Sequence, residues 1–141
     1  MSDARKELID GLNEDLAAEL EAIIHYAVGA EMMTGVHREE LREFFRSEVD
    51  DEVEHARILA HKIVALGGTP TTQPRDVEPG GTNRERLERA LAAEKETIQR
   101  YSQRLEQADA VGDLGLRVQL EDLIADETRH MHDLELILRD S

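Results

Sequence analysis

The sequence predicts an all-α fold, a four-helix bundle in which two helical hairpins are joined by a long crossover loop. Apolar residues recur at spacings of three, four and seven along four long stretches, which places them on one face of a helix. Aromatic residues make up only 3% of the chain and Trp is absent, so the core must consist of aliphatic side chains, which favours helices over a β-sandwich. All three prolines lie between the second and third stretches. A length of 141 residues suits a single domain that spans the whole chain.

The first hairpin is predicted to comprise helices at about residues 3–33 and 38–66. The first helix should end at Thr34-Gly35, because glycine readily adopts the left-handed conformation that caps a helix. The second helix should end at Gly67-Gly68 for the same reason.

Residues 67–83 form the predicted crossover loop, since they contain all three prolines and four glycines. This segment is longer than most connections in helical bundles, so it should run the length of the bundle. The second hairpin is then predicted to comprise helices at about 84–110 and 114–138, separated at Gly112-Asp113.

Composition excludes several classes of function. Charged residues make up 35% of the chain and the net charge is −15, which disfavours binding to nucleic acids and to anionic membranes. The absence of cysteine excludes disulfides and iron–sulfur clusters held by thiolates. The acidic N-terminal stretch lacks the apolar segment of a signal peptide, and no run approaches the ~20 apolar residues that span a bilayer. These features predict a cytoplasmic protein.

The chain repeats itself at an offset of 75 residues, and the repeated polar residues are potential metal ligands. Leu16-Ala17-Ala18-Glu19 recurs as Leu91-Ala92-Ala93-Glu94. Asp51-Glu52-x-x-His55 recurs as Asp126-Glu127-x-x-His130. Each half therefore supplies one single Glu and, 33 residues later, one Glu-x-x-His pair, in which Glu and His project from the same helix face.

The loop positions place these carboxylates at one depth in the bundle. Glu19 lies 16 residues before Gly35 and Glu52 lies 17 after it. In an antiparallel hairpin both then sit roughly 25 Å from the turn. Glu94 and Glu127 straddle the second turn in nearly the same way. All four carboxylates should meet near the middle of the bundle.

Converging buried carboxylates require a positive charge among them, because an unpaired buried carboxylate is costly. No Lys or Arg lies on the four inward stripes at that depth. Two divalent metal ions would balance four ionised Glu and two neutral His, and oxygen and imidazole ligands suit iron or manganese and tolerate zinc. The predicted metal-ligating and catalytic residues are Glu19, Glu52, His55, Glu94, Glu127 and His130.

Further polar residues lie next to the predicted ligands. Tyr26 and Tyr101 each follow a single Glu by seven residues, and each can hydrogen-bond a ligating Glu, lose an electron to an oxidised site, or serve only in packing. Asp51 and Asp126 can each accept an imidazole N–H from the opposite His, or can be solvated helix charges.

Glu48 has no counterpart in the repeat, because Leu123 occupies the equivalent position. It is interpreted either as an extra carboxylate on an iron path or as a charge at the bundle surface. The histidines outside the ligand positions are expected at the surface or at an interface; they are His25, His37, His61 and His132.

These residues resemble the ferritin superfamily, and bacterioferritin in particular. The resemblance covers all four helices and is carried most clearly by residues 12–26 and 51–56. It implies a ferritin-like fold with two iron ions per chain, where manganese or zinc can replace iron. By position, it implies terminal ligands Glu19 and Glu94, bridging ligands Glu52 and Glu127, and imidazole ligands His55 and His130.

Some features differ from the family pattern. Val53 stands where bacterioferritins carry a haem-ligating Met, so haem is not expected. Ser47 replaces a histidine of the bacterioferritin inner surface. The printed sequence ends just after the fourth helix, without the short fifth helix of 24-subunit cages. The expected homo-oligomer therefore ranges from a dimer to a cage of 12 or 24 subunits.

The resemblance implies a ferroxidase, an enzyme that oxidises Fe(II) with dioxygen or hydrogen peroxide for iron storage or detoxification in a protein shell. One alternative is a di-iron peroxidase or oxidase of the rubrerythrin type, which stores no iron. Another is a non-catalytic assembly protein whose bundle is stabilised by metal.

Overall fold

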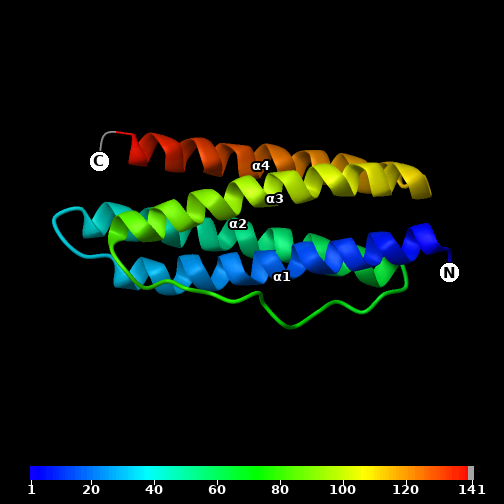
Figure 1. Cartoon of the computed structure of the whole chain (residues 1–141), viewed down its shortest axis with the longest axis horizontal. Coiled ribbons are helices and arrows are strands. Elements are labelled where there is room, and N and C mark those ends of the chain that lie inside the picture. The colour runs from blue at the N-terminus through cyan, green and yellow to red at the C-terminus, as the bar shows by residue number, and fades with distance from the viewer. Residues whose placement is uncertain (140–141) are drawn as a thin grey trace.

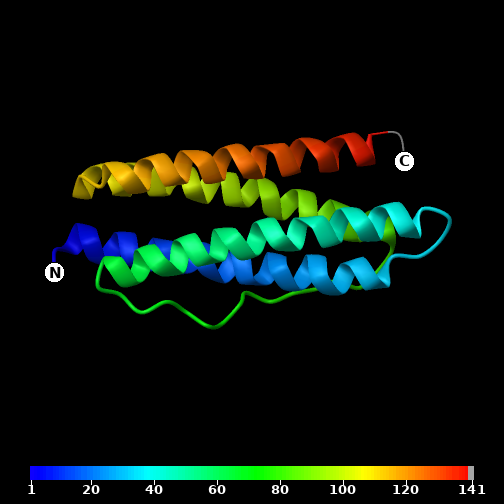
Figure 2. The same ribbon diagram turned by 180° about the vertical axis from the view of Figure 1, so that it is seen from behind.

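The computed structural model describes residues 1–139 and contains four helices: α1 (Asp3–Met32), α2 (Arg38–Ala65), α3 (Asn83–Val111) and α4 (Leu114–Leu138). Each hairpin is antiparallel, and all four helices run along the long axis of the molecule (Figure 1). Figure 2 shows the crossover segment passing along the bundle from the end of α2 to the start of α3. The predicted all-α four-helix fold is confirmed. Within the described residues, no helix is long and apolar enough to cross a membrane.

Side-chain caps and a glycine define the helix ends. Ser2 accepts a hydrogen bond from the backbone N–H of Arg5 at the start of α1. Thr82 and Glu85 form a reciprocal capping box at the start of α3, which satisfies two backbone donors that the helix leaves free. Gly112 adopts the left-handed conformation, with φ of 73°, between α3 and α4. These contacts fix where α1 and α3 begin and where α3 ends.

The apolar core is divided into two clusters by the polar middle of the bundle. One cluster contains Leu8, Leu12, Leu59, Ile63, Leu116 and Leu120 near the N-terminal end of α1. The other contains Ala30, Met33, Phe45, Leu87 and Leu134 near the opposite end. The predicted ligands thus lie between two layers of packed aliphatic and aromatic side chains, which hold the helices on both sides of them.

Hydrogen bonds to the backbone of the crossover segment attach this segment to α1. The Asn13 side chain donates to the carbonyl of Thr69 (3.1 Å) and accepts from the N–H of Thr71 (2.8 Å). Farther along, the Arg75 N–H donates to the carbonyl of Ala17 (3.1 Å). The segment therefore follows α1 closely instead of looping away into solvent.

A buried arginine joins the end of the crossover segment to α1. The Arg86 guanidinium donates to the carbonyls of Met32, Gly81 and Pro79 at 2.9, 2.8 and 3.2 Å. The ring of His25 lies beneath it, with Nε2 3.1 Å from the Arg86 carbonyl. The expectation that His25 is exposed or at an interface is wrong, because its ring fills the space between α1 and α3 and is buried.

Near each end of the contact between α1 and α3, an arginine of α3 lies against a glycine of α1. Arg86 lies 75 residues after Gly11, and Arg104 lies 75 after Gly29, so these positions are equivalent in the repeat. In the structure, a Cβ added at Gly11 would lie 2.5 Å from the Arg104 guanidinium, and one added at Gly29 would lie 3.6 Å from Arg86 Cδ. The absence of a side chain in α1 thus makes room for the long side chain of α3.

Candidate metal centre

Six predicted ligands from four helices converge at the middle of the bundle. Each of them is between 1% and 3% exposed. They come from α1 (Glu19), α2 (Glu52, His55), α3 (Glu94) and α4 (Glu127, His130). The structure therefore brings together all the residues that the repeat singled out, with each hairpin contributing half of them.

The converging side chains form two adjacent groups of potential ligands. In each group, one ligand atom per residue lies within 4.8 Å of the others. One group is formed by Glu19, Glu52, His55 and Glu127, and the other by Glu48, Glu52, Glu94 and His130.

Two carboxylates connect the groups. Glu127 lies 2.7 Å from His55 Nδ1 through Oε1 and 3.9 Å from His130 Nδ1 through Oε2. Glu52 lies 3.2 Å from His130 Nδ1 through Oε1 and 3.9 Å from His55 Nδ1 through Oε2. Each of the two carboxylates thus presents one oxygen to each imidazole.

The oxygen and nitrogen atoms that could bind a metal ion at this centre lack hydrogen-bond partners. These buried atoms are Glu19 Oε2, Glu48 Oε2, Glu52 Oε1, His55 Nδ1, Glu94 Oε2, Glu127 Oε1 and His130 Nδ1. Leaving a buried polar atom without a partner costs about 1–3 kcal/mol, and buried polar groups in proteins are normally satisfied. Oxygen and imidazole donors that converge without a partner fit divalent iron, manganese or zinc. The residues present therefore fit a pair of metal ions.

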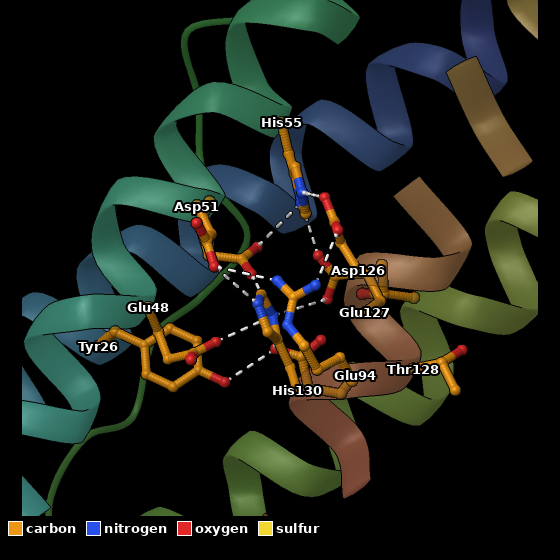
Figure 3. Close-up of polar contacts among 12 residues, drawn as sticks. Tyr26, Glu48, Asp51, His55, Glu94, Asp126, Glu127, Thr128 and His130 are labelled. Atoms are coloured by element: carbon orange, nitrogen blue, oxygen red, sulfur yellow. Dashed lines mark hydrogen bonds and ion pairs between the residues drawn. The ribbon is translucent and has the colours of Figure 1, made fainter. Parts of the chain in front are cut away.

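Each histidine is oriented by an aspartate from the opposite helix. His55 Nε2 lies 3.1 Å from Asp126 Oδ2, and His130 Nε2 lies 3.0 Å from Asp51 Oδ2 (Figure 3). Arg129 spans the two aspartates, 3.2 Å from Asp126 and 3.6 Å from Asp51. With Nε2–H donating to a carboxylate, the Nδ1 lone pair is directed into the centre, as metal-ligating histidines require.

The two tyrosines connect α1 and α3 through the centre. Tyr26 on α1 donates to Glu94 Oε1 (2.8 Å), and Tyr101 on α3 donates to Glu19 Oε1 (2.5 Å). Burial and the neighbouring carboxylates raise the pKa of both phenols well above the usual range, so both remain protonated donors. Each tyrosine also packs in the core, so the hydrogen bond and the packing role coexist.

The charges at the centre are strongly coupled. Burial and the charge of Glu19 raise the pKa of Glu52 well above its usual range. Burial lowers the pKa of His130, but Glu48 and Glu94 outweigh this effect and raise it to about 10. Bound protons therefore compensate the negative charge when no cation is present, and a cation that binds takes their place.

Glu48 is a buried member of this centre. Its side chain reaches His130 Nδ1, with Oε2 at 2.9 Å, and the residue is 5% exposed. The interpretation of Glu48 as a charge at the bundle surface is therefore wrong. The available signal was its position one helical turn before Glu52 on the same inward stripe.

A cavity of about 230 Å³ connects the centre with the α1–α3 surface beneath the crossover segment. Alanines line its walls, and Glu52, Glu94 and Glu127 lie at its inner end. At its mouth, Arg75 of the crossover segment lies 3.0 Å from Glu96 and 3.5 Å from Glu21. Sequence reasoning did not identify this opening, although Glu21 and Glu96 are equivalent positions of the repeat.

A four-helix bundle that gathers four carboxylates and two imidazoles at mid-depth has the ligand arrangement of ferritin-like carboxylate proteins. Residues 9–141 match the family model described as Ferritin-like domain, and the chain belongs to this family. The resemblance to the ferritin superfamily is therefore confirmed.

Several relatives are bacterioferritins. The chain is 33% identical over 130 residues to the bacterioferritin of Mycolicibacterium paratuberculosis, covering 92% of this chain and 82% of the relative. It is 35% identical over 125 residues to that of Mycobacterium leprae, covering 88% and 79%. These identities confirm the similarity to bacterioferritin.

Solved structures share the fold over nearly the whole chain. A ferritin-like, diiron-carboxylate protein from Bacillus anthracis superposes with a TM-score of 0.96 at 52% identity, covering 98% of this chain and 99% of that chain. The Desulfovibrio desulfuricans bacterioferritin, whose structure describes a diiron site, gives a TM-score of 0.90 at 31% identity, covering 97% and 81%.

Proposed function

We propose that this chain is one ferritin-like di-iron domain that acts as a ferroxidase, oxidising Fe(II) with dioxygen or hydrogen peroxide. The proposal is carried by seven buried oxygen and nitrogen atoms that have no hydrogen-bond partner. They converge from all four helices on one centre and could bind metal ions. Family membership supports iron as the metal, as do two similar structures, one described as a diiron-carboxylate protein and one with a diiron site.

The residues have distinct roles in the proposal. Glu19 and Glu94 would each hold one metal ion, His55 and His130 would each supply one nitrogen, and Glu52 and Glu127 would contribute oxygens to both positions. Two Fe(II) ions bound as substrate would together supply two electrons. These electrons, with two protons, would reduce one dioxygen to hydrogen peroxide, or one hydrogen peroxide to two water molecules, while both ions become Fe(III). The negative side chains favour this step because Fe(III) carries more positive charge than Fe(II).

The surroundings of the centre support this chemistry. The tyrosines hold Glu19 and Glu94 in place by hydrogen bonds, and Asp51 and Asp126 fix both imidazole rings. The α1–α3 cavity provides a path for small reactants to the carboxylates. A net charge of −15 attracts cations to the molecule as a whole.

Oxidation is tested with the bridging residues. The double variant Glu52→Gln/Glu127→Gln keeps the shape of both side chains but removes their charge, so it should remain helical by circular dichroism and lose Fe(II) oxidation. The matched control is Glu43→Gln/Glu121→Gln, which removes two exposed carboxylates from the same two helices and should oxidise Fe(II) normally. Undiminished oxidation by the first variant would overturn the proposed mechanism.

Storage is a separate part of the proposal. The bacterioferritin relatives support a homo-oligomeric cytoplasmic shell that stores or detoxifies iron. A second candidate is an oxidase or peroxidase that stores no iron. It requires only the dinuclear site, and a dinuclear iron site is all that the description of the Bacillus anthracis diiron-carboxylate protein, 52% identical to this chain, names.

Iron retention separates the two candidates. Metal-free protein is loaded with Fe(II) in air and desalted, and the iron per chain is measured together with the oligomer size. Tens to hundreds of irons per chain in a cage would establish storage, whereas about two would match a dinuclear site alone.

A further inference from the structure

We propose that Glu48 is a seventh metal ligand, and that it makes the two metal positions of the centre unequal. This inference rests on the proposed function, because it assigns a role within the same dinuclear site. It concerns the position served by His130, which would have one carboxylate more than the position served by His55.

The geometry around His130 supports coordination. Glu48 Oε2 and His130 Nδ1 approach to 2.9 Å as an ion pair, and neither atom has a partner in hydrogen-bond geometry. Around an octahedral ion with bonds of about 2.1 Å, neighbouring ligand atoms are about 3.0 Å apart. The spacing that an ion pair gives these two atoms is therefore also the spacing of adjacent ligands of one ion. Figure 3 shows Glu48 reaching from α2 toward His130 on α4.

The other ligands of this position complete the set. Donor atoms of Glu48, Glu52, Glu94 and His130 all lie within 4.8 Å of one another, and all four residues are buried. A buried carboxylate is costly unless a positive charge lies beside it. Protonated His130 can supply that charge in the metal-free protein, and a metal ion that binds would take the proton's place.

The repeat shows that the extra carboxylate is specific to one half of the molecule. Leu123 is equivalent to Glu48 and lies in the apolar core with Leu59 and Leu120. The position served by His55 therefore has an aliphatic side chain where the position served by His130 has a carboxylate. The additional negative charge should favour occupation of the His130 position first, and should favour an ion of higher charge there.

A purely structural role for Glu48 makes a different prediction. If Glu48 only paired with a protonated His130, its neutralisation would change the stability of the metal-free protein and leave the number and affinity of bound metal ions unchanged. If Glu48 is a ligand, its neutralisation must weaken metal binding at the His130 position, and the stabilisation gained on metal binding should decrease.

Zinc titration tests the inference without any redox step. Metal-free wild type, Glu48→Gln and the exposed control Glu43→Gln are titrated with Zn²⁺ by calorimetry. The wild type and the control should bind two ions per chain in two steps of unequal affinity. In Glu48→Gln the tighter step should weaken by at least about 10-fold. Glu48→Leu, which places the same residue in both halves, should bring the two steps together.

Melting temperatures of the same proteins, in chelator and in Zn²⁺, provide the second measurement. A Glu48→Gln isotherm identical to that of Glu43→Gln would overturn the inference while leaving the ferroxidase proposal intact, as would a drop in metal-free stability with unchanged zinc binding. A wild type that binds no zinc and oxidises no Fe(II) would overturn both.

Discussion

Asp15 and Arg104 form an ion pair that is almost fully enclosed between α1 and α3, away from the metal centre. Arg104 Nε donates to Asp15 Oδ2 at 2.9 Å, and the two residues are 1% and 4% exposed. Burial raises the pKa of Asp15 to about 6 against the opposing effect of Arg104, so the carboxylate remains ionised at neutral pH. Breaking such a pair leaves a buried charge without compensation.

We therefore expect Asp15→Ala to lower the free energy of unfolding by about 3 kcal/mol. The control is Glu14→Ala, because Glu14 is exposed and lies 3.6 Å from the same guanidinium, and it should cost less than about 1 kcal/mol. Urea denaturation at neutral pH measures both values. Equal losses in the two variants would show that burial of the pair has no energetic importance.

The tyrosines provide a second prediction at this scale. Tyr26→Phe and Tyr101→Phe retain the packed ring but remove the hydrogen bond to Glu94 or Glu19. Because residues that orient metal ligands typically contribute 10–100-fold to affinity, each variant should bind Zn²⁺ about 10-fold more weakly. Calorimetry checks this, and the helical content should be unchanged. Wild-type affinity in both variants would limit the tyrosines to packing.

At the residue scale, the sequence could predict which potential ligands meet in the bundle because they are repeated, as Glu19 and Glu94 are. It could not decide the role of Glu48, whose counterpart is Leu123, because an unrepeated carboxylate can face either solvent or the core. Only its burial and its distance to His130 separate these possibilities.

At the scale of the elements, the packing of α1 against α3 requires glycine in α1 where the two helices approach each other. A methyl group at Gly11 would lie 2.5 Å from the Arg104 guanidinium, which its pairing with Asp15 holds in place. Gly115 in the first turn of α4 offers a control, since its nearest neighbour would be 3.7 Å away.

Gly115→Ala should stabilise the protein by about 0.5–1 kcal/mol, because alanine is the better helix former. Gly11→Ala gains the same helix propensity but must displace Arg104, so it should destabilise the protein by about 1–3 kcal/mol. Thermal denaturation distinguishes the signs. A stabilising Gly11→Ala would mean that Arg104 moves aside at little cost.

The element pattern follows from apolar spacing and from Gly and Pro positions, which are local properties. The path of the crossover segment does not, because it depends on contacts between distant residues. No local sequence pattern indicates the hydrogen bonds of Asn13 to Thr69 and Thr71. Nor does any local pattern indicate the ion pairs of Arg75 with Glu21 and Glu96.

For the whole molecule, stability should depend on metal. A ligand that binds only the folded state at 100 times its dissociation constant adds about 2.7 kcal/mol, and these carboxylates do not converge in the unfolded chain. The melting temperature should therefore rise by several degrees from chelator to excess Zn²⁺. Glu52→Gln/Glu127→Gln should show little of this rise. Identical melting temperatures of the wild type in chelator and in metal would count heavily against the site.

At this scale, the sequence could predict the fold class and the family, because the repeat extends over most of the chain and supplies potential ligands in register from Glu19 to His130. The opening beneath the crossover segment was not predictable, since its lining combines residues of α1, α3 and the crossover segment, such as Ala18, Ala93 and Arg75, which are far apart in the sequence.

The duplication has a consequence for how such a centre can diversify. Two identical hairpins that associated as a homodimer would build the same site, but their symmetry would force every residue to appear on both sides. Joining the hairpins in one chain removes that constraint. Positions 48 and 123 can then differ, with Glu in one half and Leu in the other, and glycines of α1 can oppose arginines of α3. Covalent linkage thus allows two near-equal metal positions to evolve separate properties.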